Sequence, residues 1–287
     1  MRYRITGAMV AMAVAAAVSL TVMPLAGQAG RGAAPLPPQP AGRGAAAARP
    51  ATIAGKPNFN GVWQALGNAY WNLEDHSASG LTQFWQLGAI AAIPAGQSVV
   101  EGGSIPYLPA ALKKRQENMA GWPKTDPEAK CYMPGIPRAT YMPYPFQIVQ
   151  GQKDILFVYE YASSNRIVHM INHTEPPVDS WMGWSDGKWD GDTLVIEVTA
   201  NNDQTWFDRS GNHHSDQLKV TERYALAPGG NHINYSATIE DPRTFSRPWT
   251  IRMPLYRRME PNVQLLEFKC VEFSEELLYG DLKKKTE

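Results

Sequence analysis

Apolar and polar residues alternate with a period of two over most of the chain after residue 146. Because successive side chains of a β-strand point to opposite faces, this pattern predicts an antiparallel meander with one buried face. Turn-forming residues at 151–154, 186–187, 190–191 and 228–230 interrupt the alternation. The predicted strands are residues 146–150, 155–161, 166–171, 193–199, 218–226, 232–239, 249–254 and 263–270.

Eight strands in succession favour a mainly β fold, a closed or nearly closed barrel of the calycin or lipocalin type. A two-sheet sandwich would carry the same signals and is the alternative. Upstream, residues 57–63 predict a turn and a short first strand, with Trp63 in the core. Residues 108–119 predict a helical insertion, because proline suits the first turn of a helix and leucines recur four residues apart. Residues 273–279 predict a short C-terminal helix capped by Ser274.

The first 54 residues lack this alternation. Arg2 and Arg4 precede a mostly apolar run, and small residues follow around Ala29. This order predicts a secretory signal peptide over residues 1–29, with a retained membrane anchor as the alternative. Residues 30–54 are almost wholly Ala, Gly, Pro and Arg, which predicts a disordered linker. Residues 55–287 are then expected to form a single β-rich domain.

Charge and cysteine content limit the possible partners and the cellular compartment of this domain. The 27 Lys and Arg residues balance 27 Asp and Glu residues, and their scatter along the chain argues against nucleic acid as a partner. Cys131 and Cys270 are the only cysteines, and in an oxidising compartment they are expected to pair; two unrelated buried thiols are the alternative. The predicted location is the periplasm or the extracellular space, without stable membrane insertion after signal cleavage.

Three of the predicted strands carry a carboxylate in the same row as apolar side chains. If those rows face into a barrel, the carboxylates line its interior, where burial would raise their pKa values and suit them to acid–base chemistry. Alternatively, the strand ends reach solvent and the glutamates pair with Arg166, Arg223 or Lys219. The rows are Leu156, Val158 and Glu160; Val195 and Glu197; and Val220, Glu222 and Tyr224.

The densest group of reactive side chains lies in the predicted loop 200–217. A loop of this length that mixes aromatic and titratable groups is a common setting for a binding or catalytic site. An imidazole oriented by a carboxylate transfers protons near neutral pH, and the same groups are competent ligands for zinc or calcium. A loop whose Asp and Asn side chains cap its own backbone is the alternative. The side chains are Asp203, Trp206, Phe207, Asp208, His213, His214 and Asp216.

Short motifs recur over the chain from about residue 58 to residue 270. They are GVW at 61–63, CYMPGIPR at 131–138, PYPFQIVQ at 143–150, SWMG at 180–183, WDGDTLV at 189–195, ND with TW at 202–206, HS at 214–215, ER at 222–223 and IEDP at 239–242. Together they resemble a large family of exported bacterial proteins usually labelled hypothetical. The resemblance implies an exported single-domain protein and brings no activity, cofactor or catalytic residue with it.

These observations predict a barrel that binds a small apolar or aromatic molecule in its mouth, under loop 200–217. In an enzymatic version, His214 acts as acid or base, Asp203 or Asp208 orients it, and Glu222 supplies a second carboxylate. The alternatives are a metal-assisted hydrolase that uses the same loop and a non-catalytic structural or interaction module of the envelope. No cofactor is expected, and a metal ion is the lesser possibility. The expected ligand-binding residues are Trp206, Trp181, Tyr144, Arg138 and Tyr224.

Overall fold

A computed structural model describes residues 49–81, 92–171, 174, 176–272, 274, 277 and 281. Contacts divide the chain after Arg49, and every element named below belongs to the unit that begins at Pro50. The predicted signal peptide (1–29) and most of the predicted linker (30–54) lie outside the described residues, and so does most of the predicted helix 273–279. Among the described residues, no helix is long and apolar enough to cross a membrane.

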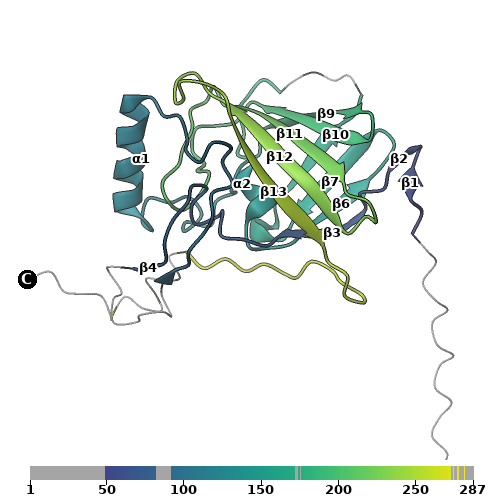
Figure 1. The fold of residues 1–287 in the computed structure, drawn as a ribbon, viewed down its shortest axis with the longest axis horizontal. Coiled ribbons are helices and arrows are strands. Elements are labelled where there is room, and N and C mark those ends of the chain that lie inside the picture. Colours follow the sequence, from purple (N-terminus) through teal and green to yellow (C-terminus); the bar gives the residue numbers. More distant parts are fainter. Residues whose placement is uncertain are drawn as a thin grey trace, which may run out of the picture. The chain divides into compact units, whose positions relative to one another are not determined.

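Nine strands close into a barrel, which confirms the predicted barrel over the sandwich (Figure 1). Around the barrel the order is β10-β11-β12-β13-β3-β6-β7-β8-β9, with β9 pairing back to β10. The strands are β3 (Gly61–Ala65), β6 (Phe146–Gln150), β7 (Asp154–Tyr159), β8 (Asn165–His169), β9 (Trp184–Asp190), β10 (Thr193–Thr199), β11 (Lys219–Leu226), β12 (His232–Glu240) and β13 (Trp249–Arg257).

One junction of the barrel departs from the predicted meander. β8 and β9 run parallel, so the chain between them must return along the barrel. The predicted turn at 186–187 is wrong, because both residues lie inside β9. A Cβ at Gly187 would come within 2.3 Å of the Met170 sulfur and 2.6 Å of Val168 Cγ1. This glycine is therefore explained by close side-chain packing inside the barrel rather than by a turn.

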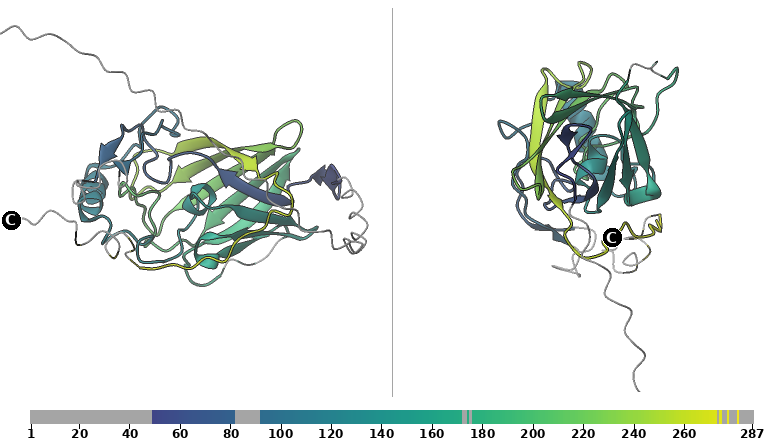
Figure 2. Two further views of the ribbon diagram at one scale, coloured as in Figure 1. Left: turned by 90° about the horizontal axis from the view of Figure 1, so that it is seen from below. Right: turned by 90° about the vertical axis from the view of Figure 1, so that its right-hand side faces the viewer.

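The predicted strand 263–270 is also wrong. Residues 258–272, here called the strap, pair with no strand and run from the end of β13 back along the barrel towards α1 (Figures 1 and 2). Most strap side chains are exposed, so no buried row holds it in a sheet. The predicted disulfide is confirmed: Cys270 of the strap is bonded to Cys131, with 5.8 Å between the two Cα atoms.

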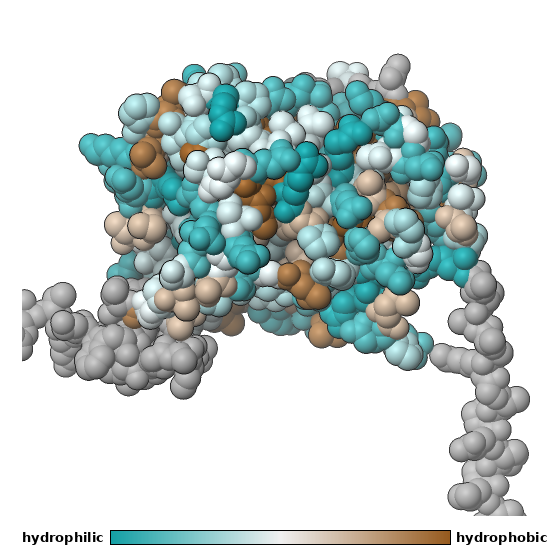
Figure 3. Space-filling view, viewed as in Figure 1, coloured by the Kyte–Doolittle hydropathy of each residue, from teal (hydrophilic) through white to brown (hydrophobic). Residues whose placement is uncertain are grey.

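The helical insertion is confirmed as α1 (Pro109–Gly121), which stands at one end of the barrel, while the hairpin of β1 (Thr52–Ile53) and β2 (Lys56–Pro57) lies at the other (Figure 1). Only Ala111 and Asn118 of α1 are buried, because the helix is polar on most of its circumference. The remaining short elements are β4 (Ser79–Gly80), β5 (Ala92–Ile93), α2 (Arg138–Tyr141) and the 3-10 turn η2 (Tyr161–Ser163). The face drawn in Figure 3 is mostly hydrophilic, with small separate apolar patches.

Apolar side chains from every strand fill the barrel, and one ion pair is buried among them. Arg166 on β8 reaches Glu222 on β11 with 2.7 Å between Nη1 and Oε2. The hydroxyls of Tyr224 and Tyr235 donate to Oε1 of Glu222 at 2.8 and 2.7 Å. The Arg166 guanidinium lies 4.7 Å from the centre of the Phe157 ring. Each charge thus has an opposite charge and polar partners, which offsets the cost of removing it from water.

Of the three rows that were considered for the barrel interior, one places its carboxylate there, and this carboxylate belongs to the buried ion pair. The row of Val220, Glu222 and Tyr224 faces the interior as predicted, with Glu222 completely buried. The rows of Glu160 and Glu197 do not line the interior, because the alternate residues of β7 and β10 face inward, and for Glu197 the predicted alternative, pairing with Lys219, is confirmed. Glu197 is exposed and pairs with Lys219 at 2.7 Å. Alternation fixes which residues share a face, and only the closed sheet decides which face is inside.

We expect Arg166→Met to destabilise the protein by about 3–5 kcal/mol, because it leaves the Glu222 carboxylate buried without its cation. The exposed Lys219–Glu197 pair of the same sheet provides the control, since Lys219→Met should cost less than about 1 kcal/mol. Urea unfolding followed by circular dichroism measures both. Equal losses in the two variants would show that the buried pair contributes no more than a surface pair.

Candidate functional site

Loop 200–217 connects β10 to β11 at the α1 end of the barrel, and hydrogen bonds fold it back on itself. The Phe207 N–H donates to the Asn212 carbonyl at 2.7 Å. The Tyr107 hydroxyl donates to Oδ1 of Asn212 at 3.0 Å and accepts the N–H of His213 at 3.2 Å. The loop is therefore anchored to the segment that precedes α1.

Asp208 is the anchor at the centre of this loop. Its buried carboxylate accepts the N–H of Leu73 at 2.8 Å, the N–H of Ser210 at 2.9 Å and the side-chain amide of Asn212 at 2.6 Å. Burial raises the pKa of Asp208 to about 6, against the lowering effect of these hydrogen bonds. With its oxygens engaged by the backbone and an amide, Asp208 holds two loops together.

His214 is also buried, and its partners differ from the predicted ones. Nδ1 lies 2.9 Å from the Ser215 carbonyl oxygen, which can only accept, so Nδ1 carries the proton. Nε2 lies 2.6 Å from the Thr205 hydroxyl and accepts from it. Burial lowers the pKa of His214, so the ring is neutral at pH 7. The predicted orientation of this ring by Asp203 or Asp208 is wrong, because both ring nitrogens have other partners.

Glu222 and Tyr224, also predicted site residues, lie inside the barrel with Arg166 and not in loop 200–217. Both are completely buried. The structure therefore does not bring Glu222 together with the histidine and aspartates of the predicted catalytic group. Those residue types were separated by the fold into a barrel interior and a surface loop.

Three of the predicted residues, Trp206, Trp181 and Asp203, do meet. They line a surface groove of about 380 Å³, here called the loop groove. Trp181 packs on Tyr132 with ring centroids 4.9 Å apart and the ring planes tilted by 41°, and Tyr132 is 48% exposed. The other residues that line the loop groove are Lys114, Asn118, Thr125, Pro127, Lys130, Gln204 and His213.

The charges in the loop groove are unequal. Burial lowers the pKa of His213 to about 4, so this ring is neutral at pH 7. Lys114 and Lys130 then face one carboxylate, that of Asp203. Among the described residues, no carboxylate forms an ion pair with either lysine. The loop groove therefore carries a small positive excess.

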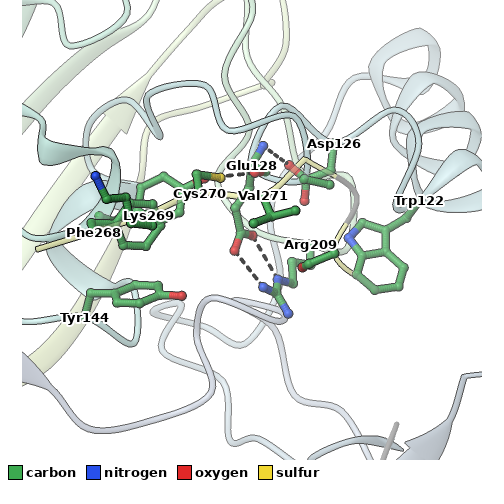
Figure 4. A pocket seen from close by; sticks show the side chains of 12 residues that line it. Trp122, Asp126, Glu128, Tyr144, Arg209, Phe268, Lys269, Cys270 and Val271 are labelled. Atoms are coloured by element: carbon green, nitrogen blue, oxygen red, sulfur yellow. Dashed lines mark hydrogen bonds and ion pairs between the residues drawn. The ribbon is translucent and has the colours of Figure 1, made fainter. Parts of the chain in front are cut away.

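The remaining predicted ligand residues, Tyr144 and Arg138, belong to a second cavity of about 240 Å³ under the strap, here called the strap pocket (Figure 4). Tyr144 lines it, and Arg138 lies behind two carboxylates that line it. The lining residues are Trp122, Asp126, Glu128, Ala129, Tyr144, Tyr161, Arg209, Phe268, Lys269, Cys270, Val271 and Ser274.

Four paired charges form one side of the strap pocket, three of them buried and the fourth, that of Arg209, partly exposed. Arg138 donates from both terminal nitrogens to Asp126, at 3.0 and 3.1 Å, and from Nη2 to Glu128 at 2.5 Å. Arg209 donates to the two oxygens of Glu128 at 2.8 and 2.6 Å. Burial alone would raise the pKa of Glu128, but the guanidiniums of Arg209 and Arg138 lower it to about 2. Glu128 therefore stays ionised at neutral pH, and two guanidiniums face two carboxylates in this group.

Sequence patterns did not reveal this group. Asp126, Glu128 and Arg209 lie in irregular segments, where no periodicity marks a buried side chain. The one available signal was their position in the sequence. Asp126 and Glu128 lie a few residues before Cys131, and Arg209 lies in loop 200–217, which was already predicted to hold a site.

Backbone strain gathers beside the strap pocket. Cys131, Ala162 and Ser163 adopt left-handed conformations, with φ of 62°, 55° and 48°. Such conformations cost a non-glycine residue roughly 1–2 kcal/mol each. The Tyr161 hydroxyl donates to the Glu128 carbonyl at 2.9 Å and helps to hold the two strained segments together. Strain of this kind is often retained where a site requires a particular shape.

The metal hypothesis gains no support from this geometry. In the part of the chain that the structure describes, no three His, Cys, Asp or Glu side chains come together as a metal site. Asp216, one of the predicted ligands, instead pairs with Arg243 at 2.7 Å.

Comparison with models of known protein families gives no match, and comparison with curated proteins gives no similar sequence. The resemblance to exported bacterial proteins therefore stays a prediction. The loop groove and the strap pocket are therefore the features of the molecule that bear on its function.

We expect the pH dependence of stability to report the buried His214. The unfolded imidazole takes up a proton below about pH 6.5 and the folded one does not, so acidification favours the unfolded state. His214→Gln should therefore lose up to about 2 kcal/mol less stability than the wild type between pH 7 and pH 5. Asp208, whose raised pKa acts in the opposite sense, contributes equally to both chains.

Urea unfolding at the two pH values measures this difference. Phe207→Leu, a buried change without a titratable group, is the control for destabilisation and should keep the wild-type pH slope. An unchanged slope in His214→Gln would mean that the folded imidazole titrates normally.

Proposed function

We propose that this chain is an exported binding protein and that a small aromatic molecule binds in the loop groove. The observation that carries the proposal is the meeting of Trp181 and Tyr132, two partly exposed rings from segments far apart in sequence, over a polar groove. The exposed faces of this ring pair contact water and have no protein partner. An aromatic ligand would bury them by packing against the rings. The disulfide fits an oxidising compartment.

The charge of the loop groove supports a ligand with an acidic group. Lys114 comes from α1 and Lys130 from the segment before Cys131, so the two ammonium groups enter the groove from different elements. A carboxylate on the ligand would gain two charge-assisted contacts and would meet one like charge, Asp203. Trp206, which is buried apart from 7% of its surface, adds apolar surface to the loop groove.

Binding is favoured over catalysis by the state of the titratable groups. His214 and Asp208 already use their polar atoms within the protein. His213, which does line the groove, has a lowered pKa and is a weak base at neutral pH. The acid–base mechanism through His214 is therefore not part of the proposal.

Naphthalene-1-acetate is a suitable probe, because it joins a bicyclic ring to a carboxylate. Trp181→Ala and Tyr132→Ala should each weaken its binding about tenfold, which corresponds to about 1.4 kcal/mol. Tyr256→Ala is the matched control: this ring is 41% exposed, lies on β13 outside the groove, and should not affect affinity.

Isothermal titration calorimetry measures the dissociation constants. The neutral amide of the same probe should bind more weakly than the acid, and added salt should reduce this difference. If neither compound binds, or if Tyr256→Ala weakens binding as much as Trp181→Ala, the loop groove is not the site.

A further inference from the structure

We propose that the strap pocket is a second ligand site, which takes an uncharged aromatic molecule, and that the Cys131–Cys270 disulfide is the latch of its outer wall. This site is separate from the loop groove: the two share no lining residue. They lie against the same segment, 122–132, some of whose residues line one cavity and some the other.

Four aromatic rings line the strap pocket. Tyr144, Tyr161 and Phe268 pack on one another with ring centroids between 4.9 and 5.5 Å apart. Trp122 lies across the cavity from Tyr144 (Figure 4). The rings come from four separate segments, so they converge only in the folded protein. A flat ligand between them would contact ring surface on both sides.

The buried charges select against a charged ligand. The two guanidiniums of Arg138 and Arg209 balance the carboxylates of Asp126 and Glu128, and all four carboxylate oxygens already accept hydrogen bonds. A charged group that entered would leave water without gaining a free opposite charge. Lys269 at the rim is 79% exposed and pairs with Glu267. An uncharged molecule avoids this desolvation cost.

The outer wall of the pocket is the C-terminal half of the strap, and among the described residues few contacts other than the disulfide hold this half. Phe268 packs on Tyr144 and Tyr161, and the N–H of Leu266 donates to Glu160 at 2.8 Å. Leu266 itself is 69% exposed and Val271 is 57% exposed. The covalent bond at Cys270 is thus the main constraint on this wall.

Cys270 is exposed, so a dithiol reductant can reach the bond. The dithiol donates two electrons and two protons: the S–S bond breaks, Cys131 and Cys270 become thiols, and the dithiol becomes a disulfide. The nine barrel strands include no part of the strap, so the barrel can stay closed while the pocket opens.

Binding of 2-naphthol, measured by calorimetry on the full chain in the Trp181→Ala background, tests the site with the contribution of the loop groove reduced. Phe268→Ala should weaken binding at least tenfold, because it removes one ring of the cavity. Leu266→Ala, an exposed change on the same strap, should leave affinity unchanged. Naphthalene-2-carboxylate should bind at least tenfold more weakly than 2-naphthol. Equal affinity of Phe268→Ala and its parent would overturn the site, and equal affinity of the two probes would overturn the charge selection.

The latch is tested by dithiothreitol, with circular dichroism to follow the barrel. Reduction should weaken 2-naphthol binding at least tenfold while the β signal is kept, and the double variant Cys131→Ser/Cys270→Ser should behave in the same way without reductant. Unchanged binding after reduction would overturn the latch. Unfolding of the barrel on reduction would also overturn it, because the disulfide would then hold the whole fold and not only the strap.

Discussion

The four paired charges of Arg138, Arg209, Asp126 and Glu128, all buried except the partly exposed Arg209, are the constraint on which both cavities depend. They hold segment 122–132, which has no regular secondary structure of its own, against α2 and loop 200–217. Removing one partner from such a group leaves a buried charge without compensation, so the group stays intact or the segment moves as a whole. The shapes of the loop groove and the strap pocket are both set by this segment.

The second buried pair, Arg166 with Glu222, does the same for the barrel. It lies among apolar side chains with two tyrosines and a phenylalanine, where alternative arrangements would leave a charge unpaired. The interior is filled and its charges are paired, and the two cavities proposed as ligand sites lie outside it, against segment 122–132. In this respect the protein uses its barrel as a rigid support, and irregular segments form its cavities.

The predicted catalytic group illustrates how proximity in sequence can mislead. Asp203, Asp208 and His214 lie within twelve residues of one another. In the structure, Asp203 faces the loop groove, whereas Asp208 and His214 bond to the backbone and to Asn212 and Thr205. Short polar side chains in a loop lie close to backbone hydrogen-bonding groups. The polar atoms of Asp208 and His214 therefore form hydrogen bonds within the protein and are not free to bind a ligand.

The sequence by itself determined the β architecture, the helix α1 and the cysteine pair, because period-two alternation, a proline-led helix and a two-cysteine count are local or compositional signals. Only the tertiary structure decided that β8 and β9 pair in parallel, that the strap is not a strand, and that Asp126, Glu128 and Arg209 meet. These outcomes depend on which distant segments come into contact when the barrel closes, and no short-range pattern records that choice. The candidate sites therefore follow from the contacts of irregular segments, while the fold follows from the alternation of its strands.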